Sequence, residues 1–400
     1  MRVLHIEKMP FANSGVTSHL RALTALQRQR GHEVFLFGCA KEPDASLPQF
    51  HDFTRSRCPA AVPRMIHNTE AANKLQAFLR RQPVDVAHVH NLYHHITPSI
   101  LPVLARHRVG VVMTVHDYRL ACPAKHFLDR RGVCTRCLPH RYFYAAGPCC
   151  MGLAGAAPAA ESLYHRFGRS YFRWVDFFLC PTEFMLSVLR TTSAPEGKCV
   201  VLPNVVEPVS MPVQANRSDR GLLFVGRLTA EKGPELMLDL AARLPEAQVT
   251  IVGDGPLLGQ LRAGAALGGL GNVNFTGPVS HDDLGAYLAS ATAVVIASRC
   301  FENSPQILLE AMAAGRCVIA PDHGPMRQWV RNRQTGRLYA PGNADSLAAV
   351  AREVLANPAQ RGAMEQAGAE RVAAAHDGQA IAARLDELYK EANRRCALRW

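Results

Sequence analysis

The stretch AVVIASRCFENSPQILLEAMAAGRCVIA (residues 293–320) indicates how this chain folds. Its first part, AVVIAS, is an apolar run bounded by polar residues, which is typical of a buried strand. Ser304 is a good helix N-cap, Pro305 a good first helical residue, and Gly315 a good helix end before the apolar run RCVIA. A strand, a helix and a second strand in this order predict a parallel βαβ unit.

The same alternation recurs along the rest of the chain. The predicted strands are residues 2–6, 32–38, 84–90, 109–117, 176–183, 200–204, 222–226, 248–253, 273–277, 293–298 and 316–320. A polar stretch with Pro208 and Pro212 interrupts the series and predicts a domain boundary. The sequence therefore predicts an α/β protein of two doubly wound, Rossmann-like domains facing across a cleft, over residues 1–206 and 207–380, with a C-terminal helix over 381–400 that packs back on the first domain.

The composition is that of a globular protein. The chain has 400 residues, of which 48% are hydrophobic and 20% charged, enough for two apolar cores. No window reaches the roughly 18 uncharged apolar residues of a membrane-spanning helix. The N-terminal MRVLHIEKMP leads directly into an alternating apolar segment and lacks the pattern of a secretory leader. We therefore expect a cytoplasmic protein in which most of the 12 cysteines are reduced thiols.

The positive charge is concentrated in one part of the chain. The formal net charge is +12, and residues 106–176 hold eleven Lys and Arg against four Asp and Glu. Such a surplus favours anionic partners, and it does not distinguish anionic lipid, nucleic acid and phosphorylated substrates.

Two loops that follow strands carry candidate binding residues. In FVGRLTAEKGPE (224–235), Arg227 and Lys232 follow a predicted strand. A guanidinium and an ammonium group both suit phosphate oxygens, and two solvated loop cations are the alternative. The run IVGDGPLLG (251–259) resembles a dinucleotide fingerprint but has one residue too many, so a tight strand-to-helix turn is the favoured interpretation.

Two glutamates flank the start of the helix in the opening stretch. Glu302 lies in the loop, and Glu310 shares a polar seam with Gln306 on an otherwise apolar helix. Glu310 therefore lies at a thin exposed edge or faces a ligand. The helix N-terminus, with its free N–H groups and positive dipole end, favours a phosphate.

These motifs together resemble the retaining glycosyltransferases of family 4, which have the GT-B fold. The resemblance rests on FVGRLTAEKG, IVGDGP, NVNFTGPVS, the eight-residue spacing of Glu302 and Glu310, EAMAAGRCVIAPDHG and TGRLYAPG, in that order. The run VLPN and the pair His116-Asp117 also fit. The match is nearly continuous in the second half of the chain and patchy in the first half.

The resemblance implies a role for each matched residue. Arg227 and Lys232 would hold the donor diphosphate, Glu310 would bind the ribose hydroxyls, and Glu302 would contact the transferred sugar. The backbone of Asn303, Ser304, Pro305 and Gln306 would meet the sugar and phosphates. Gly15 would let the backbone approach the diphosphate. His116 would lie at the sugar as a polar contact or acid–base partner.

Two departures from the family pattern concern the binding loops. Many members have a double glycine where this chain has Ser14-Gly15, and a glycine-containing run where it has Asn303-Ser304-Pro305. The second departure bears on the choice of sugar.

The chemistry implied is transfer without a metal or other cofactor. No two aspartates are two residues apart, so an Asp-x-Asp metal motif is absent from the sequence. Arg227, Lys232 and a helix N-terminus would stabilise the leaving diphosphate instead. A carboxylate nucleophile for a double displacement is not identifiable. The resemblance therefore implies a front-side displacement, with acceptor and leaving group on the same face of the sugar.

Two clusters raise the question of a bound metal. HVHNLYHH (88–95) has four histidines but lacks nearby carboxylate or cysteine partners, which favours residues ending a strand near the site. Cys122, Cys134, Cys137 and Cys149, with Cys150 beside the last, are candidate ligands of a structural zinc ion, against free or buried thiols.

The segment ESLYHRFGRSYFRWVD (161–176) is predicted as a helix with Leu163, Tyr164, Phe167, Tyr171 and Trp174 on one side. It either packs on its sheet as a crossover helix or lies on an anionic membrane surface.

These features together predict a hexosyltransferase-type glycosyltransferase that takes a UDP- or GDP-sugar. Its acceptor would be a glycolipid or saccharide in cell-surface polysaccharide or glycoconjugate synthesis, with the enzyme cytoplasmic or peripheral on the inner membrane face. A nucleotide-sugar epimerase of the same fold and a nonenzymatic nucleotide-sugar-binding protein are the alternatives. Nucleic acid is disfavoured because paired glutamates would repel its phosphates.

Overall fold

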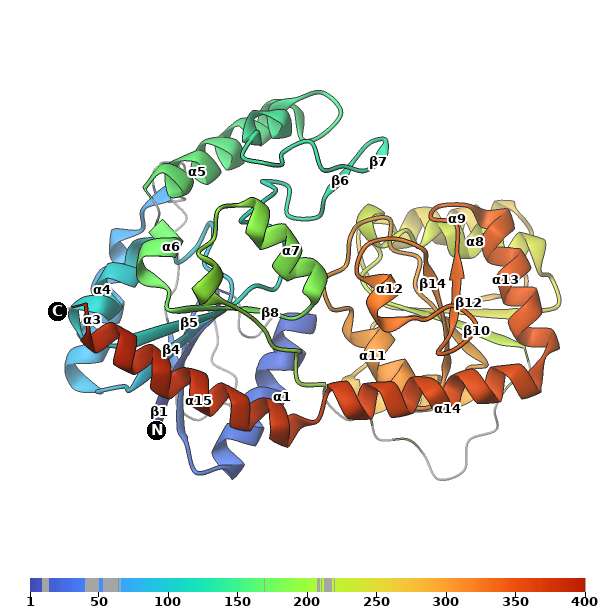
Figure 1. Cartoon of the computed structure of the whole chain (residues 1–400). Helices are drawn as coiled ribbons and strands as arrows, with labels where there is room; N and C mark the ends of the chain where they lie inside the picture. The colour runs from blue at the N-terminus through green and yellow to red at the C-terminus, as the bar shows by residue number, and fades with distance from the viewer. Residues whose placement is uncertain are drawn as a thin grey trace. The chain divides into compact units, whose positions relative to one another are not determined.

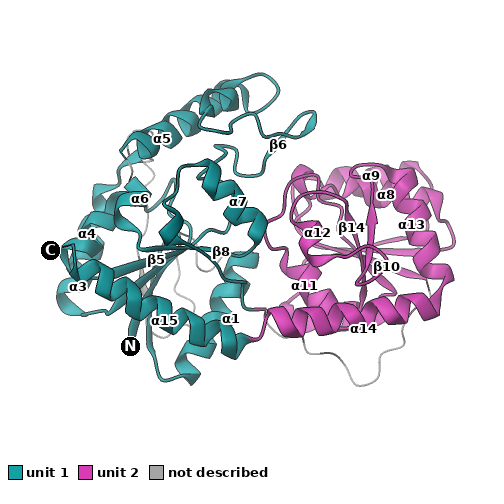
Figure 2. Cartoon of the chain, viewed as in Figure 1, with its two compact units in different colours: residues 1–205, 378–400 teal, residues 206–377 magenta. Residues whose placement is uncertain are grey.

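The computed structural model describes residues 1–8, 14–39, 50–52, 64, 66–168, 170–206, 209, 211, 218 and 220–399. They form two compact units. Unit 1 contains residues 1–205 and 378–400, and unit 2 contains residues 206–377 (Figure 2). Most of the polar stretch expected at the domain boundary lies outside the described residues. Arg169, in the segment 161–176, also lies outside them.

Unit 1 is built on a sheet of seven described strands in the order β3-β2-β1-β4-β5-β8-β9, all parallel. The strands are β1 (Arg2–Ile6), β2 (Glu33–Gly38), β3 (Phe50–Asp52), β4 (Val86–Val89), β5 (Gly110–Thr114), β8 (Phe177–Cys180) and β9 (Cys199–Val201). The chain extends the sheet in one direction from β1 and then in the other from β4. This reversal is the point at which doubly wound sheets bind ligands.

Helices connect these strands (Figure 1). They are α1 (Gly15–Gln29), α3 (Thr69–Arg81), α4 (Leu101–Arg106), α5 (Ala156–Phe167), α6 (Ser170–Trp174) and α7 (Glu183–Thr191), with the short 3₁₀ helices η1 (Pro98–Ile100), η2 (Tyr142–Ala146), η3 (Gly152–Gly155) and η4 (Glu196–Lys198). Between β5 and β8 the chain forms an insert that includes the antiparallel hairpin of β6 (Leu128–Asp129) and β7 (Gly132–Val133).

The C-terminal helix α15 (Gly378–Ala397) is part of unit 1 and packs on β5 and α1. Its apolar side, including Leu385 and Tyr389, is buried in the core. Gly110 is required at this contact, because a Cβ there would lie 2.7 Å from the carbonyl carbon of Ala392.

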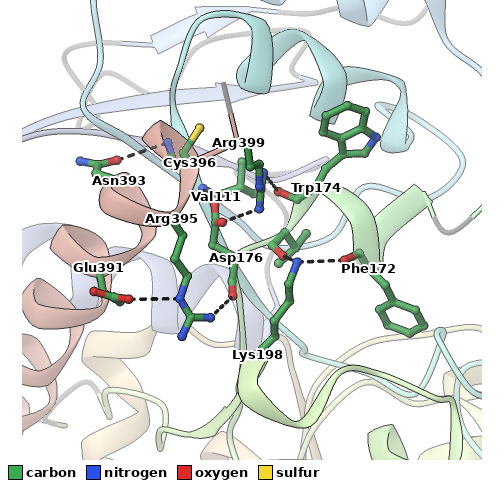
Figure 3. A network of polar contacts seen from close by, with 12 residues as sticks. Val111, Phe172, Trp174, Asp176, Lys198, Glu391, Asn393, Arg395, Cys396 and Arg399 are labelled. Carbon is green, nitrogen blue, oxygen red and sulfur yellow. Dashed lines mark hydrogen bonds and ion pairs between the residues drawn. The ribbon is translucent and has the colours of Figure 1, made fainter.

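Polar contacts hold the C-terminal end of this helix in place (Figure 3). The carboxylate of Asp176 is ion-paired with Arg399 and accepts a hydrogen bond from the N–H of Val111 at 2.9 Å. The guanidinium group of Arg395 donates to the carbonyl oxygen of Gly197 at 3.0 Å. These contacts join α15 to the β5 and β8 region, far away in sequence.

Unit 2 has six described strands in the order β12-β11-β10-β13-β14-β15, all parallel. The strands are β10 (Gly221–Val225), β11 (Gln248–Val252), β12 (Val273–Gly277), β13 (Ala293–Val295), β14 (Cys317–Pro321) and β15 (Arg337–Tyr339). The helices are η5 (Ala230–Lys232), α8 (Glu235–Arg243), α9 (Leu258–Leu267), α10 (His281–Ser290), α11 (Gln306–Ala313), α12 (Met326–Trp329), α13 (Ala344–Ala356) and α14 (Pro358–Ala375). Apolar clusters fill both faces of the sheet.

The predicted fold class is confirmed: both units are doubly wound, parallel α/β sheets. The single helix predicted over 161–176 is wrong. The chain forms α5 and α6 instead, and the apolar residues expected on one side separate. Tyr171 is buried, whereas Tyr164 and Phe167 are 53% and 82% exposed. No described helix is both long and apolar enough to cross a bilayer.

Candidate functional site

The candidate site in unit 2 lies where the strand order reverses. β10 and β13 are neighbours, and the chain extends the sheet away from each of them in opposite directions. Arg227 and Lys232 follow β10, and Glu302 follows β13. Because parallel strands end at the same edge of a sheet, the two loops meet beyond that edge.

Lys232 and Glu302 join these two loops directly. The ammonium group of Lys232 is ion-paired with the Glu302 carboxylate, which also accepts a hydrogen bond from Ser298 Oγ at 2.6 Å. Burial is the largest single effect on the pKa of Lys232 and lowers it, but the charge and hydrogen bond of Glu302, together with nearby Cys300 and Glu231, raise that pKa overall. Lys232 is therefore a cation, and an incoming phosphate would compete with Glu302 for it.

Arg227 is exposed, and the glycine-rich turn after β11 supports the loop that carries it. The N–H of Gly226 donates to the carbonyl oxygen of Val252 at 3.0 Å, and that of Leu228 to Asp254 at 2.9 Å. Gly253 has φ +137°, and a Cβ there would lie 1.9 Å from the Gly226 oxygen. The run IVGDGP is therefore a tight turn that the loop of Arg227 packs against.

The start of α11 differs from the prediction. The helix begins at Gln306, and Pro305 takes the capping position in an extended conformation. Ser304 was expected to cap this helix and does not, because the backbone of Pro305 stays extended and delays the first helical turn by one residue.

Several buried polar atoms near this point have no hydrogen-bond partner among the described residues. They are Ser304 Oγ, both amide atoms of Gln306, and Thr229 Oγ1 in the loop that leads to Lys232. Buried polar groups are almost always hydrogen-bonded in folded proteins. Thr229 and Ser304 lie on the two loops that Lys232 and Glu302 join, and Gln306 begins α11 directly after the second loop.

Glu310 lies in the second turn of α11 and is only 5% exposed. Of the two alternatives for Glu310, the structure excludes the thin exposed edge, because Gln306 and Glu310 are both buried. Asn303, next to Glu302, is also buried. Unit 2 thus brings Lys232 and Glu302 into contact, with the start of α11 next along the chain.

The two remaining site residues lie in unit 1. Gly15 is the first residue of α1, and the capping Ser14 Oγ accepts from the N–H of Thr17 at 3.3 Å. His116 follows β5, and its ring lies 5.5 Å from that of His19, one turn after Gly15 on α1. His116 is therefore beside the first turns of that helix.

The four cysteines predicted as zinc ligands are not gathered into a tetrahedron. A hydrogen bond with Cys137 lowers the pKa of Cys122 to about 7, and the same bond raises the pKa of Cys137. Cys134 Sγ instead accepts from Arg136 Nε at 3.4 Å. Within the described residues, the groups of three or more metal-ligating atoms that lie within 4.8 Å of one another are both made of histidines.

Those histidines come from the run HVHNLYHH and from elsewhere in unit 1. His88 lies in β4 and His90 just after it, and their rings stack with centroids 4.5 Å apart. Both side chains are buried, at 1% and 0% exposure. The strand alternation of the sequence predicts that they share a face, and the structure confirms it.

Three residues of the site in unit 2 have no role in the sequence-based prediction. Ser298 Oγ donates a hydrogen bond to the Glu302 carboxylate, and His323 Nε2 lies 3.2 Å from the Ser298 carbonyl oxygen. Thr229 Oγ1 has no hydrogen-bond partner among the described residues. His323 lies in the DHG of a motif used for the resemblance, and it follows β14. Its place after a strand at the same sheet edge was the signal available in the sequence.

Comparisons with known proteins agree with these features. The model of glycosyltransferase family 4 matches residues 13–209, and the model of the glycosyl transferases group 1 matches residues 210–371. A glycogen synthase of Mycobacterium tuberculosis is 33% identical over 209 residues, which are 50% of this chain and 50% of that protein. The match thus spans about half the length of that relative.

Two further proteins are similar over nearly the whole chain. A phosphatidyl-myo-inositol mannosyltransferase of Mycolicibacterium smegmatis is 25% identical over 394 residues, covering 94% of this chain and 90% of its own. The structure of Anabaena Alr3699/HepE in complex with UDP-glucose superposes with a TM-score of 0.71 at 16% identity, covering 98% of this chain and 100% of the other. The chain belongs to the GT-B glycosyltransferases of family 4, the glycosyl transferases group 1.

Proposed function

We propose that this chain transfers a sugar from a nucleotide-sugar donor to a saccharide or glycolipid acceptor, with retention of the anomeric configuration and without a metal ion. The observation that carries the proposal is the set of buried polar atoms without a partner on the loops that the Lys232–Glu302 pair joins and at the start of α11. They lie at the switch point of a doubly wound sheet, where nucleotides bind in this architecture.

The donor diphosphate would interact with Arg227 and Lys232. As the bond from the anomeric carbon to the diphosphate oxygen breaks, negative charge grows on the leaving group, and the two cations stabilise it. The acceptor oxygen would bond that carbon on the same face, and its proton would pass to the leaving diphosphate. Glu302 would contact the sugar and Glu310 the ribose. Gly15 would approach the diphosphate, and His116 the sugar.

A UDP- or GDP-sugar is the proposed donor. Anabaena HepE binds UDP-glucose, and a mannosyltransferase of Mycobacterium tuberculosis with 31% identity over 180 residues is GDP-mannose-dependent. The test incubates the protein with UDP-, GDP- and ADP-sugars, with and without a membrane extract that supplies acceptors. Acceptor-dependent release of free nucleotide from one donor supports transfer. Tight binding with no turnover of any donor would reduce the proposal to a binding protein, and an epimerised sugar would make the chain an epimerase.

Substitutions of the two glutamates should change different kinetic constants. Glu310→Gln should raise KM for the donor about tenfold with kcat retained, because it removes binding present before and during the reaction. Glu302→Gln should lower kcat about tenfold to a hundredfold, because it replaces the charged contact to the transferred sugar near the reacting carbon. Initial rates over a range of donor concentrations measure both. Glu246→Gln, at an exposed position of unit 2, is the control, and normal kinetics in both site variants would refute these roles.

We also propose that the insert of unit 1 contacts an anionic membrane that carries the acceptor. Four apolar side chains within residues 143–167 are strongly exposed: Phe143 60%, Leu153 92%, Tyr164 53% and Phe167 82%. Exposed Arg130, Arg131 and Arg141 belong to the same insert. Apolar contact combined with positive charge is the pattern of an interfacial surface.

Co-sedimentation with vesicles tests this surface. The protein should bind phosphatidylglycerol vesicles and bind phosphatidylcholine vesicles at least about tenfold more weakly, since charge supplies part of the attraction. The double variant Leu153→Ser/Phe167→Ser should lose most of the binding while keeping the turnover of a soluble acceptor. Equal binding of the variant and the wild type would contradict the proposal.

A further inference from the structure

A chain of hydrogen bonds leads from His116 into the core of unit 1. His116 Nε2 lies 2.8 Å from His90 Nδ1, and His90 Nε2 lies 3.0 Å from His5 Nδ1. His5 Nε2 lies 2.7 Å from the side-chain oxygen of Gln27 on α1. His90 and His5 therefore each use one nitrogen toward the ring before them and the other toward the group after them.

The chain of hydrogen bonds continues from the other end of the Gln27 amide. Gln27 Nε2 donates to the Tyr389 hydroxyl at 2.9 Å, and that hydroxyl lies 2.7 Å from His88 Nδ1. His88 Nε2 lies 2.7 Å from Thr114 Oγ1. Tyr389 lies on α15, and with Gln27 Nε2 directed at its hydroxyl, the amide oxygen of Gln27 faces His5.

The rings of His116, His90 and His5 are neutral. Burial lowers the pKa of His5 to about 4 and lowers those of His90 and His116 well below their usual range. A neutral imidazole has one nitrogen that donates and one that accepts. Each ring in the chain must therefore donate in one direction and accept in the other.

The oxygen of Gln27 sets the direction, because a carbonyl oxygen can only accept. His5 must then hold its proton on Nε2 and accept at Nδ1. His90 must donate from Nε2 to His5, and so accepts at Nδ1. His116 must donate from Nε2 to His90. We propose that His90, His5 and Gln27 are positioning residues that hold His116 in its Nε2–H tautomer, with Nδ1 as its proton-accepting nitrogen.

This tautomer decides how His116 takes part in the transfer; the consequence rests on the function proposed above. An unprotonated Nδ1 accepts a hydrogen bond and cannot donate one. His116 would therefore bind a hydroxyl group of the sugar or acceptor that points its proton at the ring. The sequence leaves two roles open for His116, a polar contact and an acid–base partner. With this tautomer, His116 accepts a hydrogen bond at Nδ1, and the same nitrogen can serve as a base.

A metal ion held by these rings is the competing arrangement. His19, His90 and His116 each place one ring atom within 4.8 Å of the others, as do His5, His88 and His90. However, the facing nitrogens of His90 and His116 are 2.8 Å apart, which is a hydrogen-bond distance. Two imidazole ligands of one tetrahedral zinc ion would stand about 3.3 Å apart. The hydrogen-bond chain fits the rings better.

Nitrogen NMR of the intact chain tests the tautomer without any substrate. In protein labelled with ¹⁵N at its 17 histidines, the spectrum of a His116→Gln variant identifies the His116 signals. The expected result is a protonated Nε2 and a non-protonated Nδ1 at pH 7.5. A protonated Nδ1 would overturn the proposal, and so would a shift of metal-bound nitrogen accompanied by stoichiometric metal in the purified protein.

Two matched variants test the positioning role. His90→Phe removes the relay next to His116, and His88→Phe removes an equally buried ring beyond Gln27. His90→Phe should lower kcat about tenfold or more with KM for the donor retained, and should give a mixture of His116 tautomers. His88→Phe should leave the tautomer and kcat unchanged, whatever it does to stability.

The outcomes separate this proposal from the one it rests on. Equal losses of kcat in His90→Phe and His88→Phe, with an unchanged His116 tautomer, would overturn the positioning role. The expected tautomer in a protein that turns over no donor would leave the positioning role standing and refute the proposed function. If His90→Phe does not fold, the spectrum of the wild type alone decides the tautomer.

Discussion

Arg227→Ala is expected to lower kcat/KM for the nucleotide-sugar donor about 100- to 1,000-fold, the loss typical of removing one group that stabilises developing negative charge. The melting temperature should stay unchanged, because Arg227 is exposed and the turn at Gly253 supports its loop through backbone contacts. The large kinetic effect follows from when the charge appears. The diphosphate gains negative charge as the sugar bond breaks, so a lost guanidinium group costs more in the transition state than in the bound donor.

Initial-rate kinetics and thermal unfolding on the same preparations measure this prediction. Arg227→Lys should restore part of the activity, since an ammonium group keeps the charge and loses the bidentate geometry. Arg262→Ala removes an exposed arginine of α9 in the same unit and should change neither quantity. An Arg227→Ala protein with a lowered melting temperature and normal kcat/KM would assign Arg227 to the fold and remove it from the site.

The strand series of the fold was predictable because both sheets are parallel and covered by helices on both faces. Such strands read as short apolar runs, and the runs at 222–226 and 248–253 became β10 and β11. The strands β3 and β15 were missed. Each has three residues and lies at an edge of its sheet, so neither supplies a long enough apolar run.

The helix pattern over residues 161–176 shows neither the break at Gly168, which caps the end of α5, nor the tertiary contact at the start of the segment. Residues 161–176 carry a helical pattern, but the chain ends α5 at Phe167 and resumes at Ser170. Glu161 at the start of that segment is buried and forms an ion pair with Arg119 at 2.5 Å. A carboxylate in the core needs its partner. That partner lies 42 residues earlier, where no local pattern can show it.

The site was predictable in its residue types and not in its contacts. Sequence position places Lys232 and Glu302 after two strands, but their ion pair depends on β10 and β13 being neighbours. The histidines show the same limit. The run at 88–95 favours residues that end a strand near the site over metal ligands. It cannot show that His5, Gln27 and Tyr389, from three other elements, join these rings by hydrogen bonds.

The buried histidines should also make unit 1 acid-labile. His5 is fully buried, and its pKa is about 4 in the folded protein, against roughly 6.5 in an unfolded chain. The unfolded state therefore binds the proton first as the pH falls. Stability from His5 is fully present above about pH 6.5 and is lost progressively down to about pH 4. That loss is about 3 kcal/mol for this ring, and His88, His90 and His116 shift in the same direction.

Urea unfolding at pH 7.5, 6.5, 5.5 and 5.0 measures this effect in a window above the titration of ordinary carboxylates. Each buried ring should contribute a slope of up to about 1.4 kcal/mol per pH unit to the free energy of unfolding. His88→Phe removes one titrating ring, so its slope should be smaller by about that amount even if its stability at pH 7.5 is lower. His67→Gln, at an exposed histidine, should keep the wild-type slope. A free energy of unfolding that does not change between pH 7.5 and 5.0 would mean that these rings accept protons in the folded state. A protonated ring donates from both nitrogens, so the hydrogen-bond chain could then not fix the tautomer of His116.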